Sequence, residues 1–370
     1  MQESRRLNVG LRSVGLMGAL LVAGCTEYEP FTLLPFNPDS PQDTYCSIST
    51  AEIFIGSAQD AIPALTNPRI VAPGHAETAY IGDNDRVIGI RAGVDALAIP
   101  LSILRYHEIV NVDFLGGLQL AVTHCPLTGS SLAFDRGPAG DAEFGVSGLL
   151  YRNNLMMYDR NSEESLWPQM VRGARCGSRD GTALQMHPVV EMTWSAWREM
   201  HPTTWVVSDA TGYPNNNYQI HPYGDYDEND EVSWPTAIDT RRHPKERTLG
   251  VIDASGGVGY PFGELESLGP IAVVDHAGVT SAQGGTVVFW DGAARSAMAY
   301  SRVVDATELS FSVVADQIVD AETSSTWRVD GVATSGPLAG RRLDEVAEAY
   351  VAFWFAWAGF ESGQTLWEAP

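Results

Sequence analysis

Alternating apolar and polar positions predict that this chain is built mostly of short β-strands. In the stretch 118–123, Leu118, Leu120 and Val122 alternate with more polar or smaller residues, which is the two-residue period of a strand with one buried face. Steps such as Gly116-Gly117 are typical of the turns between such strands. The same reasoning predicts further strands at 87–90, 132–135, 144–150, 155–159 and 286–290.

Three stretches have the composition of short helices: Leu101–His107, Met192–Met200 and Leu343–Phe355. Because strand patterns dominate, the sequence predicts a β-rich α+β fold in which a few short helices are peripheral. Paired tryptophans at 194/197 and 354/357 are expected to close the cores, since large aromatic side chains bury the most area per residue.

Many short motifs recur in the same order about 160 residues later. Self-similarity at a nearly constant offset is the signature of a repeated unit. We therefore expect two tandem homologous β units: a first unit at 51–210, a connecting loop region at 211–246, and a second, degenerate copy at 247–370. The recurring pairs include Arg86–Ile90 with Arg247–Val251, Ser130–Arg136 with Ser296–Arg302, Asp159 and Trp167 with Asp320 and Trp327, and Trp194–Trp197 with Trp354–Trp357.

The first 24 residues have the features of a bacterial lipoprotein signal peptide. Three arginines precede an apolar stretch of about ten residues, which is too short to span a bilayer. The run Val22-Ala23-Gly24-Cys25 resembles the lipobox, in which small side chains precede the cysteine that receives a diacylglycerol. An ordinary signal peptide with a chance cysteine is the alternative.

We expect lipidation at Cys25 and a proline-rich tether over 25–50, so that lipid chains anchor an exported protein to a membrane. Thr26, rather than an aspartate, follows the cysteine. By resemblance to lipoprotein sorting, this favours the outer membrane, facing the periplasm.

Composition and charge narrow the function classes. The 370 residues are 44% hydrophobic, which is enough for folded cores. The formal net charge of −23 would be repelled by phosphate backbones, so we expect no nucleic-acid partner. An acidic run at 225–231 is expected to be a solvated face.

If Cys25 is lipidated, three cysteines remain in an oxidising compartment, and at least one has no partner within the chain. A Cys46–Cys176 bridge that leaves Cys125 free is one of three possible pairings.

Candidate chemistry gathers in the first unit only. His107, His124, Cys125 and Met157 are imidazole, thiolate and thioether ligands, which suit copper or another soft metal. If one strand runs through residue 125, alternation places His124 and Cys125 on opposite faces, so that His107 is the better partner for Cys125. The structural alternative is that Cys125 and Met157 are core residues and that His107 caps a helix.

Four motifs of this chain resemble an uncharacterised bacterial family, the domain of unknown function 3179, over roughly residues 52–357. The resemblance implies no established reaction. The family usually has Cys-Pro-Leu-Cys-Gly-Ser, whereas the second cysteine is replaced here by Thr128, so the local two-cysteine chemistry is lost. The motifs are Tyr106–Asn111, Val122–Ser130, Phe144–Tyr151 and Leu155–Arg160.

These observations favour a lipid-anchored envelope protein that binds a soft metal or small ligand through its first unit. One alternative, suggested by the resemblance, is a thiol- or metal-dependent oxidoreductase accessory. Another is a non-catalytic envelope interaction protein. Whether the protein is an enzyme stays open, with a non-enzymatic role preferred.

Overall fold

A computed structural model describes residues 46–370, apart from 162–164, 235, 253–256, 282–283 and 362. These residues belong to one compact unit. The predicted signal peptide, Cys25 and most of the tether lie outside the described residues.

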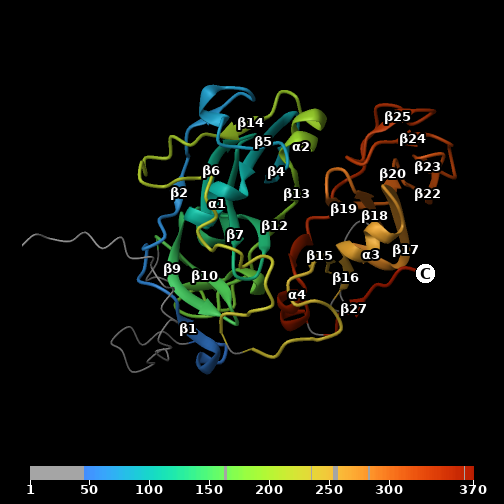
Figure 1. The fold of residues 1–370 in the computed structure, drawn as a ribbon. Helices are drawn as coiled ribbons and strands as arrows, with labels where there is room; N and C mark the ends of the chain where they lie inside the picture. Colours follow the sequence, from blue (N-terminus) through green and yellow to red (C-terminus); the bar gives the residue numbers. More distant parts are fainter. Residues whose placement is uncertain (1–45, 162–164, 235, 253–256, 282–283, 362) are drawn as a thin grey trace, which may run out of the picture. The chain divides into compact units, whose positions relative to one another are not determined.

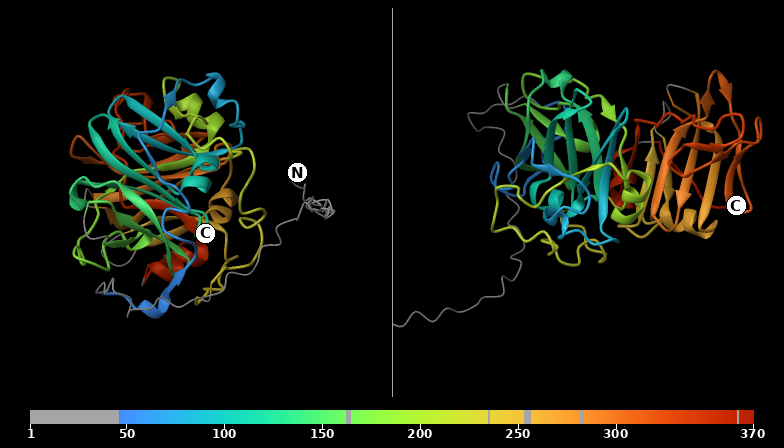
Figure 2. Two further views of the ribbon diagram at one scale, coloured as in Figure 1. Left: turned by 90° about the vertical axis from the view of Figure 1, so that its left-hand side faces the viewer. Right: turned by 90° about the horizontal axis from the view of Figure 1, so that it is seen from above.

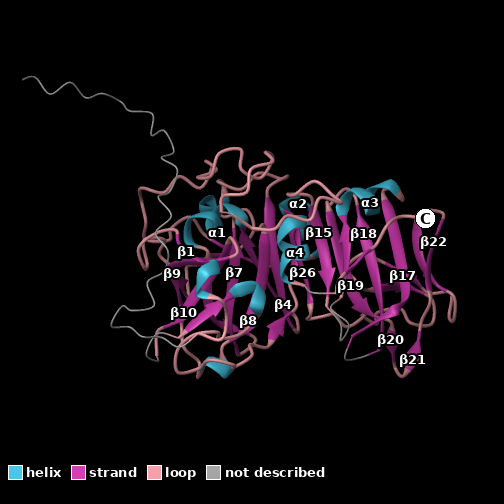
Figure 3. Cartoon of the chain, turned by 90° about the horizontal axis from the view of Figure 1, so that it is seen from below, coloured by secondary structure: helices cyan, strands magenta, loops and turns pink. Residues whose placement is uncertain are grey.

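The fold is β-rich, with only short helices in the described part of the chain, as the sequence predicts (Figure 3). We call residues 46–210 the first half, 211–246 the connecting segment and 247–370 the second half. In the first half the strands and α-helices are β1 (Ile53–Ile55), β2 (Leu65–Thr66), β3 (Ile70–Val71), β4 (Arg86–Ala92), β5 (Asp95–Pro100), α1 (Leu101–His107), β6 (Ile109–Leu115), β7 (Leu118–Cys125), β8 (Ser130–Asp135), β9 (Phe144–Tyr151), β10 (Asn154–Asp159), β11 (Leu166–Pro168), β12 (Met186–His187), β13 (Val190–Thr193), α2 (Trp194–Met200) and β14 (Trp205–Val207).

The second half repeats part of this order (Figure 1). Its elements are β15 (Arg247–Val251), β16 (Val258–Pro261), α3 (Phe262–Ser267), β17 (Ile271–Ser281), β18 (Gly284–Asp291), β19 (Ser296–Ser301), β20 (Val303–Val304), β21 (Thr307–Glu308), β22 (Phe311–Val314), β23 (Gln317–Asp320), β24 (Thr326–Trp327), β25 (Ala333–Ser335), β26 (Ala349–Phe353), α4 (Trp354–Phe360) and β27 (Thr365–Leu366). Short 3-10 turns lie at Thr50–Glu52, Ala76–Thr78, Gly137–Ala139 and Gln169–Val171.

Both halves contain the order strand, strand, helix, then three strands: β4 to β8 around α1, and β15 to β19 around α3. Details recur as well. The Trp167 indole donates to Asp159 at 2.8 Å, and the Trp327 indole donates to Asp320 at 2.9 Å. A common origin of the two halves stays a prediction, although these features agree with it.

Strand contacts join the two halves, which lie side by side in the right-hand view of Figure 2. Strand β26 of the second half pairs with β8 of the first through Val351 and Ser131, so that one nine-stranded sheet contains strands of both halves. In addition, β13 of the first half lies beside β19, and the Thr193 amide donates to the Ala294 carbonyl at 3.0 Å. The predicted boundaries at 210 and 247 therefore mark positions in the sequence but not separate sheets.

Two of the buried cores also contain residues of both halves. One buried cluster joins Phe134 and Trp167 of the first half to Tyr350 and residues 352–357 of the second. Another joins Trp194 and Trp197 to Phe289 and Tyr300. The tryptophan pairs do close cores, as expected, but these cores are shared between the halves.

The predicted helix at Leu343–Phe355 is wrong over most of its length. Residues 349–353 form β26, and only the tryptophan end continues into a helix, α4. All five residues of β26 are buried. An apolar run that is buried on both faces lacks the two-residue period, so its pattern does not distinguish a strand from a buried helix.

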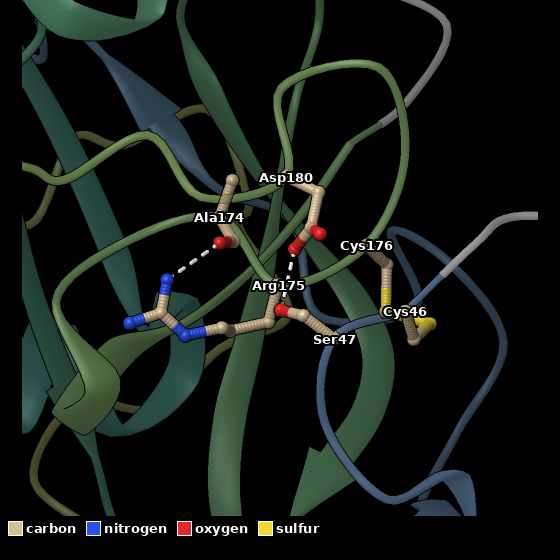
Figure 4. The surroundings of a disulfide bond; sticks show 6 residues. All are labelled: Cys46, Ser47, Ala174, Arg175, Cys176 and Asp180. Carbon is tan, nitrogen blue, oxygen red and sulfur yellow. Dashed lines mark hydrogen bonds between the residues drawn. A yellow bond between two sulfur atoms is a disulfide. The ribbon is translucent and has the colours of Figure 1, made fainter.

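A disulfide joins Cys46 to Cys176, which lie 130 positions apart in the sequence (Figure 4). The Ser47 hydroxyl donates to Asp180 at 2.6 Å close to the bridge. The bridge ties the beginning of the described chain to the loop after β11. Among the described residues, no helix combines the length and the hydropathy needed to cross a bilayer.

Candidate functional site

The four predicted metal ligands are distributed over different environments. Strand β7 runs through residue 125, so its side chains alternate between two faces. Cys125 and Met157 belong to one buried cluster. His124 projects to the opposite face, and His107 lies at the end of α1.

Both ring nitrogens of His107 have partners within the protein. Nδ1 lies 2.8 Å from the Pro63 carbonyl and Nε2 lies 2.7 Å from the Tyr218 hydroxyl. A carbonyl can only accept, so Nδ1 carries the hydrogen and Nε2 accepts from the tyrosine. Burial lowers the pKa of His107, which favours this neutral form.

His124 is part of a buried ionic network. Its Nδ1 contacts the Ser131 hydroxyl at 3.0 Å, and Ser131 in turn donates to Glu191 at 3.2 Å. Burial lowers the pKa of His124 to about 3. Burial alone would raise the pKa of Glu191, but the guanidinium groups of Arg247 and Arg86 lower it to about 2. The network thus joins the two halves through a paired carboxylate.

Cys125 is a buried thiol. It is the one free cysteine in the part of the chain that the structure describes. Its sulfur contacts the Leu155 amide at 3.3 Å, while burial and the nearby Glu108 raise its pKa to about 11. A thiol in this environment is protonated at neutral pH, which makes it a poor nucleophile. No cluster of three or more His, Cys, Asp or Glu suited to a metal occurs among the described residues.

A pocket of about 870 Å³ lies beside α1, between residues 60–66 and the connecting segment. We call it the tyrosine pocket because Tyr106, Tyr213 and Tyr223 line it. Its volume lies within the range of pockets that hold small organic ligands. Tyr106 lies on α1, whereas the other two tyrosines come from the connecting segment.

Glu108 lies behind the wall of the tyrosine pocket and has two unusual properties. Its backbone is in the left-handed region, with φ of 56°, which costs free energy in a residue other than glycine. Its side chain is only 6% exposed, and burial raises its pKa to about 8. The Tyr223 hydroxyl donates to its carboxyl group over 3.4 Å.

Three features meet at Glu108: a strained backbone, a carboxyl group that is protonated at neutral pH, and contact with a pocket-lining tyrosine. Strain and perturbed pKa values both concentrate at functional sites. The backbone position is held from both sides, because the Glu108 amide donates to the Leu104 carbonyl at 2.6 Å and its carbonyl accepts from the His124 amide at 2.8 Å.

Charges in the wall of the tyrosine pocket are balanced. Asp60 and Arg160 form an ion pair at 2.7 Å, and Arg105 and Glu143 contribute one further charge of each sign. The wall therefore carries no net formal charge, which does not favour a charged ligand over a neutral one.

Sequence reasoning missed Glu108, Tyr213 and Tyr223. Glu108 enters the sequence analysis only as a member of the motif Tyr106–Asn111. The density of tyrosines in the connecting segment is the sequence signal that could have indicated the pocket. Large aromatic rings are uncommon in fully solvated loops, and this segment has four, at 213, 218, 223 and 226.

The comparisons with known proteins agree with the resemblance seen in the motifs. A family model described as a protein of unknown function, DUF3179, matches residues 59–364. Neither the curated proteins nor the solved structures contain a match to this chain. The match spans both halves and the connecting segment, including every wall of the tyrosine pocket. The chain therefore belongs to the DUF3179 family.

Proposed function

We propose that this is an exported, lipid-anchored protein that binds a small, neutral, polyhydroxylated ligand, such as an oligosaccharide, in the tyrosine pocket. The observation that carries the proposal is the pocket itself: about 870 Å³, lined by three tyrosines and balanced charges, next to the strained Glu108. Sugar rings have apolar faces that pack on aromatic rings, and their hydroxyl groups need the donors and acceptors that this wall provides.

The side chains around the pocket fit such a ligand. Tyr213 is 40% exposed, and its ring packs against His107 with the ring centroids 5.1 Å apart. Asp60, Arg160 and Asn216 also line the pocket and supply hydrogen-bonding groups. Tyr106 is already oriented, because its hydroxyl donates to the carbonyl groups of residues 217 and 220 in the connecting segment. A preformed wall lowers the ordering cost of binding.

Isothermal titration calorimetry with maltotriose, cellotriose and chitotriose tests this proposal. We expect saturable binding of at least one trisaccharide, weakened about tenfold by Tyr213→Ala. Trp205→Ala is a matched control, since Trp205 is a similarly exposed aromatic residue (43%) that does not line the pocket. Absence of binding by all three sugars, or an equal loss in both variants, would contradict the proposal.

Export and lipid anchoring are supported by the order of basic, apolar and small residues before Cys25. The Cys46–Cys176 disulfide supports them further, because such bonds persist in oxidising compartments. Labelling with radioactive palmitate should mark the wild-type chain in the membrane fraction, and Cys25→Ala should abolish the label. A labelled Cys25→Ala protein would contradict lipidation at this cysteine.

A soft-metal site is a second candidate, favoured only by the presence of Cys125 and Met157 in one buried cluster. It is weaker, because His107 and His124 are engaged elsewhere. Elemental analysis of anaerobically purified wild-type protein and of Cys125→Ala tests it. Copper retained by the wild type alone would favour the site, and no copper in either would reject it.

The oxidoreductase alternative needs a reactive thiol, and the raised pKa of Cys125 argues against one. Rapid alkylation of Cys125 in the folded protein at pH 7 would revive it. If the protein binds no sugar, retains no metal and does not react with thiol reagents, these results favour the remaining alternative, a non-catalytic envelope interaction protein.

A further inference from the structure

A second, smaller pocket has Arg105 in its wall as well. It has a volume of about 110 Å³ and lies between the beginning of α1 and residues 218–221 of the connecting segment. Arg86, Ser102 and His221 also line it. This volume fits a few water molecules or one small polyatomic group, but not a sugar ring.

Two donors in this wall have no hydrogen-bond partner among the residues that the structure describes: the Ser102 hydroxyl and the Arg105 Nε–H, both of which are buried atoms. Buried polar groups are nearly always paired in folded proteins, so two unpaired groups in one small pocket require an explanation. Arg105 is held in place nonetheless, because its Nη2 donates to Asp227 at 3.0 Å.

His221 adds a third donor. Its Nδ1 accepts the Tyr223 amide hydrogen at 3.1 Å, so in the neutral ring the hydrogen is on Nε2. Nε2 is buried and its nearest charged neighbour, Asp227 Oδ2, lies 3.5 Å away, beyond a good hydrogen bond. The pocket therefore presents donors of three different kinds and needs an acceptor.

We propose that this pocket binds a carboxylate group of a small ligand. A carboxylate has two oxygens with about four acceptor positions, and it pairs readily with arginine. It would accept from Ser102 Oγ and Arg105 Nε, and from His221 Nε2 when that bond displaces the long contact to Asp227. The proposal is independent of the sugar assignment of the tyrosine pocket.

Charge in the wall favours a monoanion over a dianion. Arg86 contributes positive charge, but its three nitrogens already donate to Glu191 and to the carbonyl groups of residues 191 and 295. Asp85 also lines the pocket, and its carboxylate accepts from the Gly82 amide at 2.7 Å. Asp227, which contacts Arg105 and His221, is a second acidic side chain close to the pocket. These two carboxylates would repel the two charges of a phosphate more than the single charge of a carboxylate ligand.

The test is calorimetric titration of the full-length protein with sodium acetate and, separately, with sodium phosphate, at constant ionic strength in chloride. We expect saturable acetate binding, and a 10- to 100-fold loss of affinity in Ser102→Ala, since a hydrogen bond to a charged group is removed. Because Ser102 Oγ has no partner among the described residues, this variant should unfold at the wild-type temperature. Arg105→Lys, which keeps the charge but removes Nε, should weaken acetate binding as well.

Ser296→Ala is the matched control. Ser296 is another buried serine whose hydroxyl has no partner among the described residues, but it lies on β19, away from the lining of this pocket. We expect acetate binding to be unchanged in it. Absence of saturable acetate binding, or equal affinity in wild type and Ser102→Ala, would overturn the proposal. Binding of phosphate without acetate would overturn the carboxylate assignment.

Discussion

Replacement of Glu108 by glutamine should make the protein more stable, by an amount that grows with pH. The side chain is 6% exposed, and burial raises the pKa of this carboxyl group from 4.5 to about 8. Glutamine has the shape of a protonated glutamate and cannot ionise. The variant therefore removes the titration and keeps most of the packing around Tyr223.

The sign and size of the effect follow from linkage. Because the pKa in the folded state lies above that in the unfolded state, the stability contributed by Glu108 is complete below pH 4.5 and is lost as the pH rises towards 8. Each pKa unit corresponds to about 1.4 kcal/mol. Relative to acidic pH, the wild type should lose about 3 kcal/mol at pH 7 and about 5 kcal/mol at pH 9, whereas Glu108→Gln should not.

Urea denaturation followed by tryptophan fluorescence at pH 5, 7 and 9 measures this difference. Subtracting the two proteins cancels other titrations, such as those of His107 and His187, whose pKa values are lowered by burial. Glu228→Gln, at an exposed position of the connecting segment, is the control and should follow the wild type. A difference between wild type and Glu108→Gln that stays constant from pH 5 to pH 9 would refute the assignment of a buried, protonated carboxyl group.

Three further measurements address the packing. Gly250→Ala should destabilise the protein by about 2–3 kcal/mol, because an added Cβ would lie 2.0 Å from the Trp357 ring. Gly359→Ala is the control, since its added Cβ meets open space on α4, and it should be neutral or stabilising. Equal thermal unfolding midpoints for the two variants would contradict this packing. Arg247→Ala leaves the buried Glu191 with one guanidinium partner fewer and should lower the free energy of unfolding, measured in urea, by about 3 kcal/mol. Arg341→Ala should lower it by less than about 1 kcal/mol, because the Arg341–Asp305 ion pair is more than half exposed. Similar losses in the two variants would refute the importance of the buried network. Cys46→Ser should lower the free energy of unfolding by about 3–5 kcal/mol, since the bridge closes a loop of 130 residues. The reduced wild-type protein should show the same loss. If both have the unfolding midpoint of the oxidised wild type, the bond contributes nothing to stability.

Local sequence patterns predicted where strands and helices lie better than they predicted which strands pair with one another. The strand at 118–123 and the helix at Leu101–His107 were correct, because alternation and helical composition are properties of neighbouring residues. The pairing of β26 with β8 could not be predicted, since nothing in the motif Ser130–Arg136 specifies which distant strand will lie beside it. Residues 349–353 were wrongly expected to be helical, because their burial on both faces depends on contacts with the other half that the local pattern does not reveal.

The candidate site was predicted only in part. The motif Tyr106–Asn111 contains both His107 and Glu108, but the sequence pointed to the imidazole as the reactive group. What distinguishes Glu108 is its φ of 56° and its burial, and these arise from tertiary contacts rather than from composition. The acidic run at 225–231 was expected to be a solvated face, yet Asp227 turns inward to Arg105. The nearby His221 ring and the charges of Arg247 and Arg105 keep the pKa of Asp227 below the usual range despite burial.

The pairing of β26 with β8 has a consequence for biogenesis. Ribosomes and export channels release a chain from its N-terminus, so β8 emerges more than 200 residues before its neighbour β26. Strand β12 already pairs with one part of β8, but until β26 emerges the edge of β8 around Ser131 stays unpaired. This edge and the apolar faces that later receive Tyr350 and residues 352–357 are then open to aggregation. The folding of the nascent protein thus depends on residues 349–370, and a truncation before β26 would leave a chain that quality-control proteases should degrade.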